Sequence, residues 1–533
     1  MDSPIRMINA AGLKAALHDR KEIALLDARE EVPFEARHLL MAACVPLSRL
    51  ELLVDACVPR RSTRVVWCDN GEGLAQRAAA CMASFGYTDV SVLAGGIAAW
   101  EADGFRIYSG VHVPSKAFAE VVEHKAGTPW ITSEELKDLI DSNANIALFD
   151  SRSYEEFHGN SIPTATNVPG AELVYRFADL VTSPETMVVV NCGGRTRSII
   201  GAQSLINTGV PNKVVSLKNG TQAWHLSGFQ VLKGSTARPP AVSAAGHAAA
   251  RTAADYVAKR FGIARIDADT LSLWQAGSAT RTLYEFDVRT PEEYLAGHIP
   301  GMKNVPGGQL VQATDRHAVT WGARIVLVDD DGVRSVMTAH WMKQMGWDAV
   351  AMTVDMQAEG RQIGPWEPQV LGLGSVTIPS IDAISLHQRM QSGGVTVIDL
   401  DWSRDYIAGH IPCAWYGIRA RIDQILPQLP SSDTVVFTSS DGVLAKLATA
   451  DLMRTSSVSV LALDGGTAAW RKAGFWMEQG LTNMATLPDD IRLRAREKGE
   501  KVEEAMRAYL SWEINLADQM ATDDDQRFSI LTD

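Results

Sequence analysis

The sequence repeats one arrangement of strand and helix segments four times, and this repetition constrains the fold more than any other feature. Each copy opens with an apolar run that ends in aspartate: IALLD (Asp27), IALFD (Asp150), LYEFD (Asp287) and VTVID (Asp399). These aspartates recur with a mean period of about 124 residues. Such a period is too long for a solenoid unit and long enough for each copy to bury its own core. The chain is therefore expected to form four tandem domains.

Within each copy, a second apolar strand follows the aspartate and leads into a loop and a helix. The four passages read VVWCDNGEG, VVVNCGGRTRS, IVLVDDDGVRS and VVFTSSDGV. Three copies then close with a Gly-rich segment that ends in tryptophan (Trp100, Trp224 and Trp470), whereas the third copy has diverged there. Short Val/Ile/Leu strands that alternate with helical segments are typical of an α/β domain in which helices cover both faces of a parallel sheet.

The composition of the connecting segments indicates the domain limits. We expect domains at residues 1–110, 128–234, 262–370 and 376–480, followed by a helical extension at 481–533. The Pro/Ala/Ser-rich stretch 234–246 is expected to divide the chain into two pairs, so that copy one packs against copy two. The extension is charged and mostly amphipathic, and is expected to pack on the last domains or on a partner subunit, which would give a homo-oligomer.

Composition also limits the classes of partner. The net charge is −13 and no dense Lys/Arg run occurs, so we expect no nucleic-acid partner. No run of about 18 apolar residues is present, and the N-terminal segment lacks the apolar stretch of a signal peptide. We therefore expect a cytoplasmic protein without a membrane partner. Six cysteines without CxxC spacing argue against a zinc site and against a disulfide framework.

The loop of copy two has the composition of a site for a nucleophile and an anion. Cys192 lies between a parallel strand and a helix, where open α/β sheets bind ligands. Gly193 and Gly194 free the backbone to direct several N–H groups at one atom. The helix N-terminus adds positive potential, and Arg195 and Arg197 add forked donors. We expect this loop to lower the pKa of Cys192 and to hold an anionic substrate.

The other three copies lack this cysteine. Alignment of the loops places Asp69, Asp330 and Ser439 at the position of Cys192, and places Cys68 one residue earlier, opposite Asn191. A carboxylate would repel a bound anion, and a serine hydroxyl with no adjacent base is a weak nucleophile. Copies one, three and four are therefore expected to be catalytically silent.

These motifs resemble the rhodanese family of sulfurtransferases. DVRTPEEYLAGHIPGMKNVP is similar to the first signature segment of the family, CGGRTRS resembles its active-site loop, and the GGxxAW endings resemble its last signature. The resemblance extends to about Gly480. It implies four rhodanese-like domains and a sulfur carried on Cys192 as a persulfide, with no metal or organic cofactor. It also implies a small anionic donor such as thiosulfate, a cyanide or thiol acceptor, and a substrate-binding loop formed by Gly193, Gly194, Arg195, Thr196, Arg197 and Ser198.

The sequence leaves some alternatives open. Arg152 is either an ion-pair partner that stabilises the fold or a lining residue of the pocket. A cysteine-dependent phosphatase is disfavoured because its loop reads C-x5-R, whereas Cys192 and Arg197 give C-x4-R. A sulfur carrier, sensor or scaffold without turnover is the non-enzymatic alternative. The histidines of the GHIP-like segments (His38, His298 and His410) are expected to be structural, because the cysteine-bearing copy has Ser161 at that place. We further expect copy one to form one wall of the cleft around Cys192.

Overall fold

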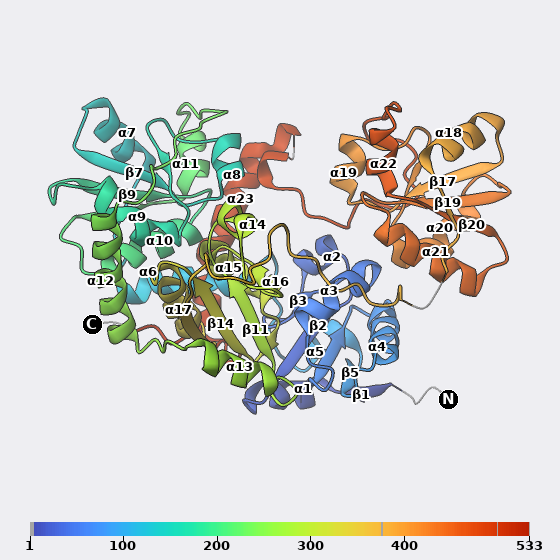
Figure 1. Cartoon of the computed structure of the whole chain (residues 1–533), viewed down its shortest axis with the longest axis horizontal. Helices are drawn as coiled ribbons and strands as arrows, with labels where there is room; N and C mark the ends of the chain where they lie inside the picture. Colours follow the sequence, from blue (N-terminus) through green and yellow to red (C-terminus); the bar gives the residue numbers. More distant parts are fainter. Residues whose placement is uncertain (1–4, 375–376, 498, 532–533) are drawn as a thin grey trace.

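The computed structural model describes residues 5–374, 377–497 and 499–531, and it contains four sheets in four domains (Figure 1). The expected domain limits at residues 1, 376 and 533 lie outside the described residues. Within each domain the strands pair in parallel, and helices lie against the sheet. The four repeats of the sequence are thus four α/β domains, as expected from the alternation of strand and helix segments.

Copies one and two share one order of elements. Copy one comprises β1 (Arg6–Ile8), α1 (Ala10–His18), β2 (Ile23–Asp27), α2 (Glu31–Ala36), β3 (Ala43–Cys44), η1 (Leu47–Arg49), α3 (Leu50–Cys57), β4 (Val65–Cys68), α4 (Leu74–Ser84), β5 (Val90–Leu93) and α5 (Gly96–Ala102). After the connecting helix α6 (Val113–Ala126), copy two comprises β6 (Trp130–Ile131), α7 (Ser133–Asp141), β7 (Ile146–Asp150), α8 (Tyr154–Gly159), β8 (Thr166–Asn167), α9 (Glu172–Leu180), β9 (Met187–Asn191), α10 (Thr196–Asn207), β10 (Val214–Leu217) and α11 (Gly220–Leu226).

Copies three and four follow a second connecting helix, α12 (Ala244–Phe261). Copy three comprises α13 (Ala268–Ala276), β11 (Leu283–Asp287), α14 (Pro291–Ala296), β12 (Lys303–Asn304), α15 (Gly307–Gln312), α16 (Thr314–His317), β13 (Thr320–Trp321), β14 (Arg324–Asp329), α17 (Arg334–Gln344) and β15 (Asp348–Thr353). Copy four comprises β16 (Ser380–Ile381), α18 (Ala383–Ser392), β17 (Val395–Asp399), α19 (Ser403–Ala408), β18 (Trp415–Tyr416), η2 (Arg419–Arg421), α20 (Ile422–Ile425), η3 (Leu426–Gln428), β19 (Thr434–Thr438), α21 (Val443–Thr455), β20 (Ser459–Leu463) and α22 (Gly466–Lys472).

The sheet of copy two shows why its loop lies where it does. The strand order is β6-β10-β9-β7-β8, so β9 is central. Its residues Val188, Val189 and Val190 are fully buried, as expected for a strand covered by helices on both faces. The loop that carries Cys192 begins at the carboxyl end of this strand and leads into α10. In copy three, by contrast, the described residues form no helix directly after β15, in agreement with the divergent ending of that repeat.

The domains do not pair as the linker composition suggested. Copy two packs against copy three so closely that a β-carbon on Gly308 would lie 3.2 Å from the Cα atom of Gly170. Copy one packs against copy four, where the Arg419 guanidinium donates to Glu51 at 2.8 Å. Copy one also joins copy three, because β13 adds to β2 as an antiparallel strand. The expected pairing of one with two is therefore wrong. Linker composition reports chain stiffness, whereas the buried faces decide which domains meet.

The C-terminal extension runs back across the molecule instead of remaining with copy four. Only Val502–Ala521 forms the long helix α23, and Figure 1 shows it beside copy two. It is preceded by two short 3-10 helices, η4 (Ala495–Glu497) and η5 (Gly499–Lys501). Before these, copy one binds the backbone, because the amides of Glu31 and Val32 donate to the carbonyls of Asp490 and Asp489. Helical periodicity in the sequence predicts a longer helix, because it does not report backbone hydrogen bonds to copy one that replace those within a helix.

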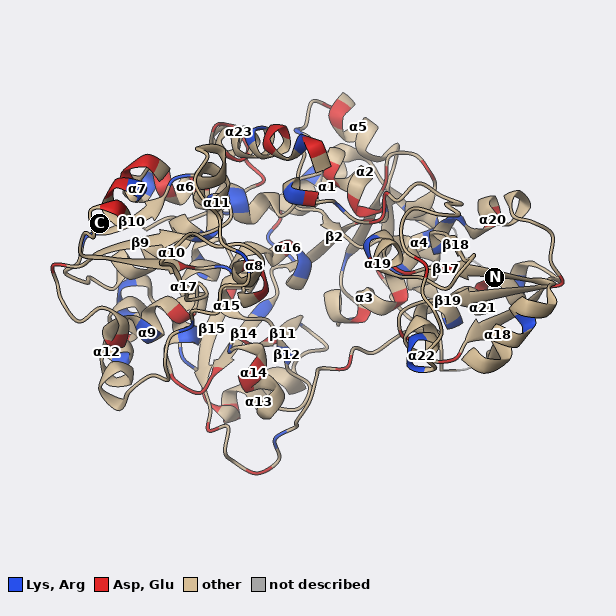
Figure 2. Cartoon of the chain, turned by 90° about the horizontal axis from the view of Figure 1, so that it is seen from above, with Lys and Arg blue, Asp and Glu red and all other residues tan. Residues whose placement is uncertain are grey.

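None of the described helices combines the length and the apolar character needed to cross a membrane. Figure 2 shows basic and acidic residues interspersed along the ribbon, with several acidic residues on α7. Mixed charge of this kind does not form the basic face that nucleic acid requires, and the absence of a nucleic-acid partner stays a prediction.

Candidate active site

Strand register identifies the true counterparts of Cys192. Asp150 pairs with Asn191 on neighbouring strands, just as Asp27 pairs with Cys68, Asp287 with Val328 and Asp399 with Thr438. The next residue is therefore Cys192 in copy two, Asp69 in copy one, Asp329 in copy three and Ser439 in copy four. The alignment to Asp330 was wrong by one residue, because a run of three aspartates hides the end of the strand.

The silent loops are filled by their own side chains. In copy three, Asp329 accepts hydrogen bonds from the amides of Gly332 and Ser335 at 3.1 and 2.9 Å. In copy one, Asp69 accepts from Gly71 and Ala75 at 2.9 and 3.0 Å. Each carboxylate thus occupies the concave group of amides that the loop forms. Such a nest binds anions, and in these two copies the anion is part of the protein.

The loop of copy two leaves its amides without such an occupant. Among the described residues, no carboxylate accepts a hydrogen bond from the amides of residues 193–197. Cys192 replaces the carboxylate, and its thiol donates to the Ser198 hydroxyl at 3.6 Å. Ser198 donates in turn to the Arg195 carbonyl at 2.7 Å. The cysteine thus stands where the silent copies one and three have a carboxylate, and the loop amides of residues 193–197 remain available for a ligand.

Cys192 is buried, and this changes the expected electrostatics. Its exposure is 2%. Burial raises the pKa of the Cys192 thiol above its ordinary value, while Arg197 and Ser198 oppose that shift and Glu513 adds to it. The expectation that the loop lowers this pKa does not hold in this closed arrangement. The reason is that the cost of burying the thiolate outweighs the favourable effects of Arg197 and Ser198.

Arg197 is held by Glu156. Its two terminal nitrogens donate to the two oxygens of Glu156 at 2.6 and 2.9 Å. Glu156 is set in place by a capping box with Ser153 at the start of α8. Burial would raise the pKa of Glu156, but the ion pair with Arg197 outweighs it and holds that pKa well below its ordinary value. Silent copy three repeats the pair as Arg334 with Glu293, so the pair belongs to the fold.

Arg195 turns away from the sulfur. Its guanidinium donates to the two oxygens of Glu120 on α6 at 2.7 and 2.8 Å, and it also pairs with Glu123. A further donor reaches Asn219 Oδ1 at 3.1 Å. The structure therefore places Arg195 as a clamp between the loop and α6. A direct contact of this side chain with a donor molecule would require breaking a buried bidentate pair.

Arg152 forms an ion pair of the kind that the first alternative describes. Its Nη2 atom donates to Asp150 at 2.6 Å and to the carbonyl of Asn160 at 2.6 Å. The same pair occurs in silent copies one (Arg29 with Asp27) and three (Arg289 with Asp287). Its stem lies beside the loop, since a β-carbon on Gly193 would be 3.8 Å from Arg152 Cδ. A structural role thus explains the residue without reference to the cysteine.

The three histidines behave alike. Nδ1 of His38, His298 and His410 lies 2.7 to 2.9 Å from the carbonyl oxygen four residues earlier. Each ring also stacks on an aromatic ring of that same residue: Phe34, Tyr294 or Tyr406. All three are buried. These contacts are the ones expected of structural histidines.

Helix α23 covers the loop, and sequence reasoning missed this completely. Thr196 donates from its hydroxyl to Glu513 Oε1 at 2.7 Å. A β-carbon on Gly194 would lie 3.0 Å from Glu513 Oε2 and 3.1 Å from the ring of Tyr509. The Tyr509 hydroxyl accepts a hydrogen bond from Lys116 of α6. The only sequence signal was the length of the extension, because Thr196 and Glu513 are 317 residues apart.

Copy one is not the wall of this site. The described residues that contact the loop come from α6, from α23 and from copy two itself. On the other side, a cavity between copies two and three is lined by Thr196, Arg197, Gly201, Gly307, Met337 and Trp341. Copy one reaches only the edge of the site, where Trp512 donates to the carbonyl of Ser109 at 2.9 Å and Glu35 of α2 pairs with Arg492. The predicted packing of copy one around Cys192 is corrected accordingly.

Gly220 explains the Gly-rich ending of the repeats. Its φ is +56°, and a β-carbon there would lie 2.3 Å from the carbonyl oxygen of Cys192. Gly96 and Gly466 make the same approach to Asp69 and Ser439 in the silent copies. The next amide, that of Thr221, donates to the Cys192 carbonyl at 2.8 Å. The motif thus fixes the start of the loop against α11.

We predict that Gly220→Ala loosens the loop, because the added methyl group must displace the Cys192 carbonyl. The matched control is Gly228→Ala, whose φ is +77° but whose β-carbon would meet nothing within 4 Å. The control is destabilised only by the strain of an alanine in the left-handed backbone conformation, which costs about 1–2 kcal/mol. Hydrogen exchange of the segment 188–201 should accelerate strongly for Gly220→Ala and little for the control. Equal acceleration in both variants would contradict the contact.

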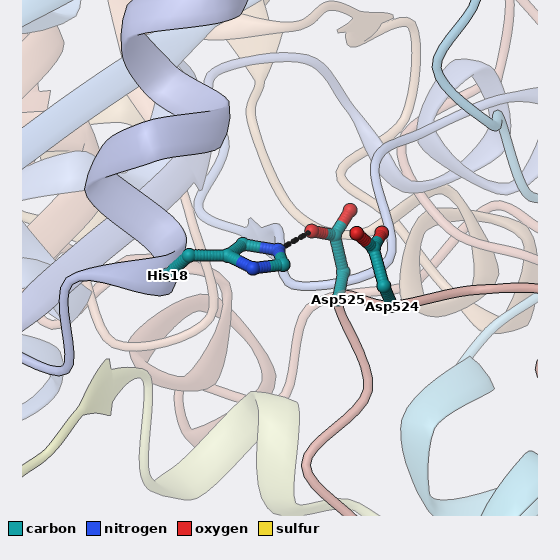
Figure 3. A group of neighbouring side chains, drawn as sticks. All are labelled: His18, Asp524 and Asp525. Atoms are coloured by element: carbon teal, nitrogen blue, oxygen red, sulfur yellow. Dashed lines mark hydrogen bonds and ion pairs between the residues drawn. The ribbon is translucent and has the colours of Figure 1, made fainter.

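A second cluster of titratable residues lies at the far end of α23 (Figure 3). His18 Nε2 contacts Asp525 Oδ1 at 2.8 Å, and Asp524 lies next to it. The three side chains resemble a metal site in type, but the Lys14 ammonium already lies 2.7 Å from Asp525 and also pairs with Asp524. The cluster therefore ties the C-terminal tail to α1.

Comparison with known proteins gives one family for all four copies. The model of the rhodanese-like domain matches residues 9–103, 132–227, 272–355 and 382–473. The crystal structure of thiosulfate sulfurtransferase from Pseudomonas aeruginosa is similar over 99% of this chain and 100% of that chain, with 43% identity and a TM-score of 0.96. YrkF of Bacillus subtilis, described as a candidate sulfur carrier protein, is 26% identical over 102 residues, which are 19% of this chain and 54% of the relative. The chain thus matches about half the length of that relative.

Proposed function

Because the chain belongs to the rhodanese family, we propose that it is a sulfurtransferase that moves sulfane sulfur from thiosulfate or a related donor to a thiol or cyanide through a persulfide on Cys192. The proposal draws on the similarity to the Pseudomonas aeruginosa thiosulfate sulfurtransferase. It draws equally on the loop of copy two, which alone among the four corresponding loops carries a cysteine at the position of Cys192. Copies one, three and four serve as scaffold.

The chemistry divides into two displacements. The Cys192 thiolate attacks the outer sulfur of the donor, a new S–S bond forms, and the S–S bond of the donor breaks. With thiosulfate, sulfite leaves with the bonding electron pair. The acceptor then attacks the outer sulfur of the persulfide and releases the Cys192 thiolate, so that cyanide yields thiocyanate. Because the two half-reactions share one covalent intermediate, ping-pong kinetics follow.

One observation supports this function above the others. Among the described residues, the amides of residues 193–197 donate to no carboxylate, whereas Asp69 and Asp329 accept hydrogen bonds from the corresponding loop amides of copies one and three. A free nest next to a thiol suits a persulfide sulfur, which needs several hydrogen-bond donors around it. The Ser198 hydroxyl and the Arg197 guanidinium support the thiolate. The arginines position the loop, and the amides hold the sulfur.

The test is mass spectrometry of the intact protein after treatment with thiosulfate. We expect one added sulfur, located on Cys192 and lost when cyanide is added. The loading rate should increase between pH 6 and pH 9, because the thiolate is the nucleophile and burial raises the pKa of Cys192. Repeated formation of thiocyanate identifies an enzyme, whereas a single loading without turnover identifies a carrier or sensor. Loading at Cys68 would overturn the assignment.

A further inference from the structure

The charged side chains around Cys192 carry no net positive charge that would attract a dianionic donor. Arg195 is paired with Glu120 and Glu123, and Arg197 is paired with Glu156. On the segment that leads into α23, Arg492 pairs with Glu35 at 2.6 Å. The remaining buried cation of the site is Lys116, which faces α23 and whose pKa burial lowers to about 8. With the buried pair of Arg152 and Asp150 beside the loop, six carboxylates, including Glu513, thus stand against five cations.

Glu513 is the unusual member of this set. It is fully buried, and its Oε1 atom accepts from Thr196. Its Oε2 atom is buried, and the neighbouring Tyr509 hydroxyl, which accepts from Lys116, is left to donate to the Glu513 carboxylate. That oxygen is the one that points at the loop, 3.0 Å from where a β-carbon of Gly194 would be. Burying a carboxylate is costly even when it has hydrogen-bond donors, so its position against the cysteine-bearing loop requires an explanation.

The charge of Glu513 acts on the reacting sulfur. It raises the pKa of the Cys192 thiol after burial, and it also raises the pKa of Tyr509, which lies on the same face of α23. Arg494 and Arg496 lie nearby on the preceding segment but are exposed, where water screens them. A ligand that reaches Cys192 therefore meets the buried negative charge of Glu513, which Lys116 opposes only in part, because burial lowers the pKa of Lys116 to about 8.

We infer that Glu513 selects the donor: its carboxylate disfavours dianionic donors such as thiosulfate relative to donors with one negative charge, namely thiosulfonates and the persulfides of thiols. The inference rests on the proposed sulfur transfer and names the charge class of its donor.

The chemistry balances without a further reactant. With methanethiosulfonate as donor, the Cys192 thiolate bonds to the outer sulfur, the donor S–S bond breaks, and methanesulfinate leaves with the electron pair. One proton from water protonates the outer sulfur before the transfer. Attack by an acceptor thiolate then gives the acceptor persulfide and the Cys192 thiolate. Glu513 itself forms no covalent bond, so it is a specificity-determining residue.

The test compares kcat/KM for thiosulfate and for methanethiosulfonate in the full chain. Glu513→Gln keeps an acceptor for Thr196 but removes the charge. It should raise the thiosulfate-to-methanethiosulfonate ratio of kcat/KM by about tenfold, as expected for one unit of charge at a few ångströms in a partly buried site. Glu513→Met should move the ratio in the same direction. The control Asp518→Asn removes an exposed carboxylate from the same helix and should leave the ratio unchanged.

The ratio does not depend on the fraction of folded protein, since both donors react with the same active molecules. A ratio that Glu513→Gln leaves unchanged, or that Asp518→Asn raises equally, overturns the inference while the transfer of sulfur stands. Failure of the unmodified protein to load sulfur from either donor would instead reject the proposed function. The two failures are thus separate observations.

Discussion

Cys192→Ser is expected to abolish the formation of thiocyanate from thiosulfate and cyanide, with a loss of at least about 1,000-fold in kcat. A serine hydroxyl cannot form a persulfide, and its pKa is too high for it to act as the thiolate does. The nest itself should survive, because Ser439 occupies the same position in copy four and accepts from the amide of Ala445 at 3.2 Å. Loss of activity should therefore come without loss of fold, which circular dichroism can verify.

The matched control is Cys68→Ser. Cys68 is fully buried at the end of β4, in the position that Asn191 takes in copy two. Burial raises the pKa of Cys68 well above its ordinary value, so it is a poor nucleophile. We expect this variant to retain activity and to gain one sulfur from thiosulfate. Full activity in Cys192→Ser, or its loss in both variants at an intact fold, would refute the assignment of the nucleophile.

Arg195→Met is expected to destabilise copy two by about 3–5 kcal/mol, because it leaves Glu120 buried without its partner. Glu120 is 0% exposed and lies on α6. The double variant Arg195→Met/Glu120→Gln removes the unpaired charge and should recover much of that loss. Hydrogen exchange of α6 and α10 measures the change directly, and it avoids treating a chain of several domains as a two-state system.

The same pair of variants distinguishes two roles of Arg195. If the residue only clamps the loop to α6, the double variant should regain sulfur transfer along with stability. If it contacts the donor, the double variant should stay slow at a restored fold, with a raised KM for thiosulfate. We expect the first outcome, because the Nε and Nη2 atoms of Arg195 already donate to the carboxylates of Glu120 and Glu123. The second outcome would return Arg195 to the substrate-binding set.

Local patterns in the sequence were sufficient for the repeats and the sheets, and they single out Cys192 as the proposed nucleophile. Strand periodicity and the aspartate at the end of each first strand located the four domains, and the glycines after Cys192 identified the one loop with room for a ligand. The alignment failed only where DDD in copy three offered three equivalent choices. Asp329 is distinguished by its bonds to Gly332 and Ser335, and these bonds exist only once the loop is folded.

Long-range partners could not be predicted. Arg195 and Arg197 read as free positive charge in the sequence, because Glu120 is 75 residues away on a connecting helix and Glu156 is 41 residues away on α8. A guanidinium near a binding loop carries the same local signal whether it is paired or free. The pairing of copies two and three depends in the same way on a close approach of Gly170 and Gly308, which no linker composition reveals.

The cover that α23 places over Cys192 has a consequence for biosynthesis. Thr196 leaves the ribosome 317 residues before Glu513. At ordinary translation rates this interval is roughly 15 to 60 s, long enough for copy two to fold while its thiol is still open to the surrounding metabolites and oxidants. Closure of the site therefore waits for the synthesis of α23, and a nascent chain without α23 presents a more reactive cysteine than the folded chain that carries this helix.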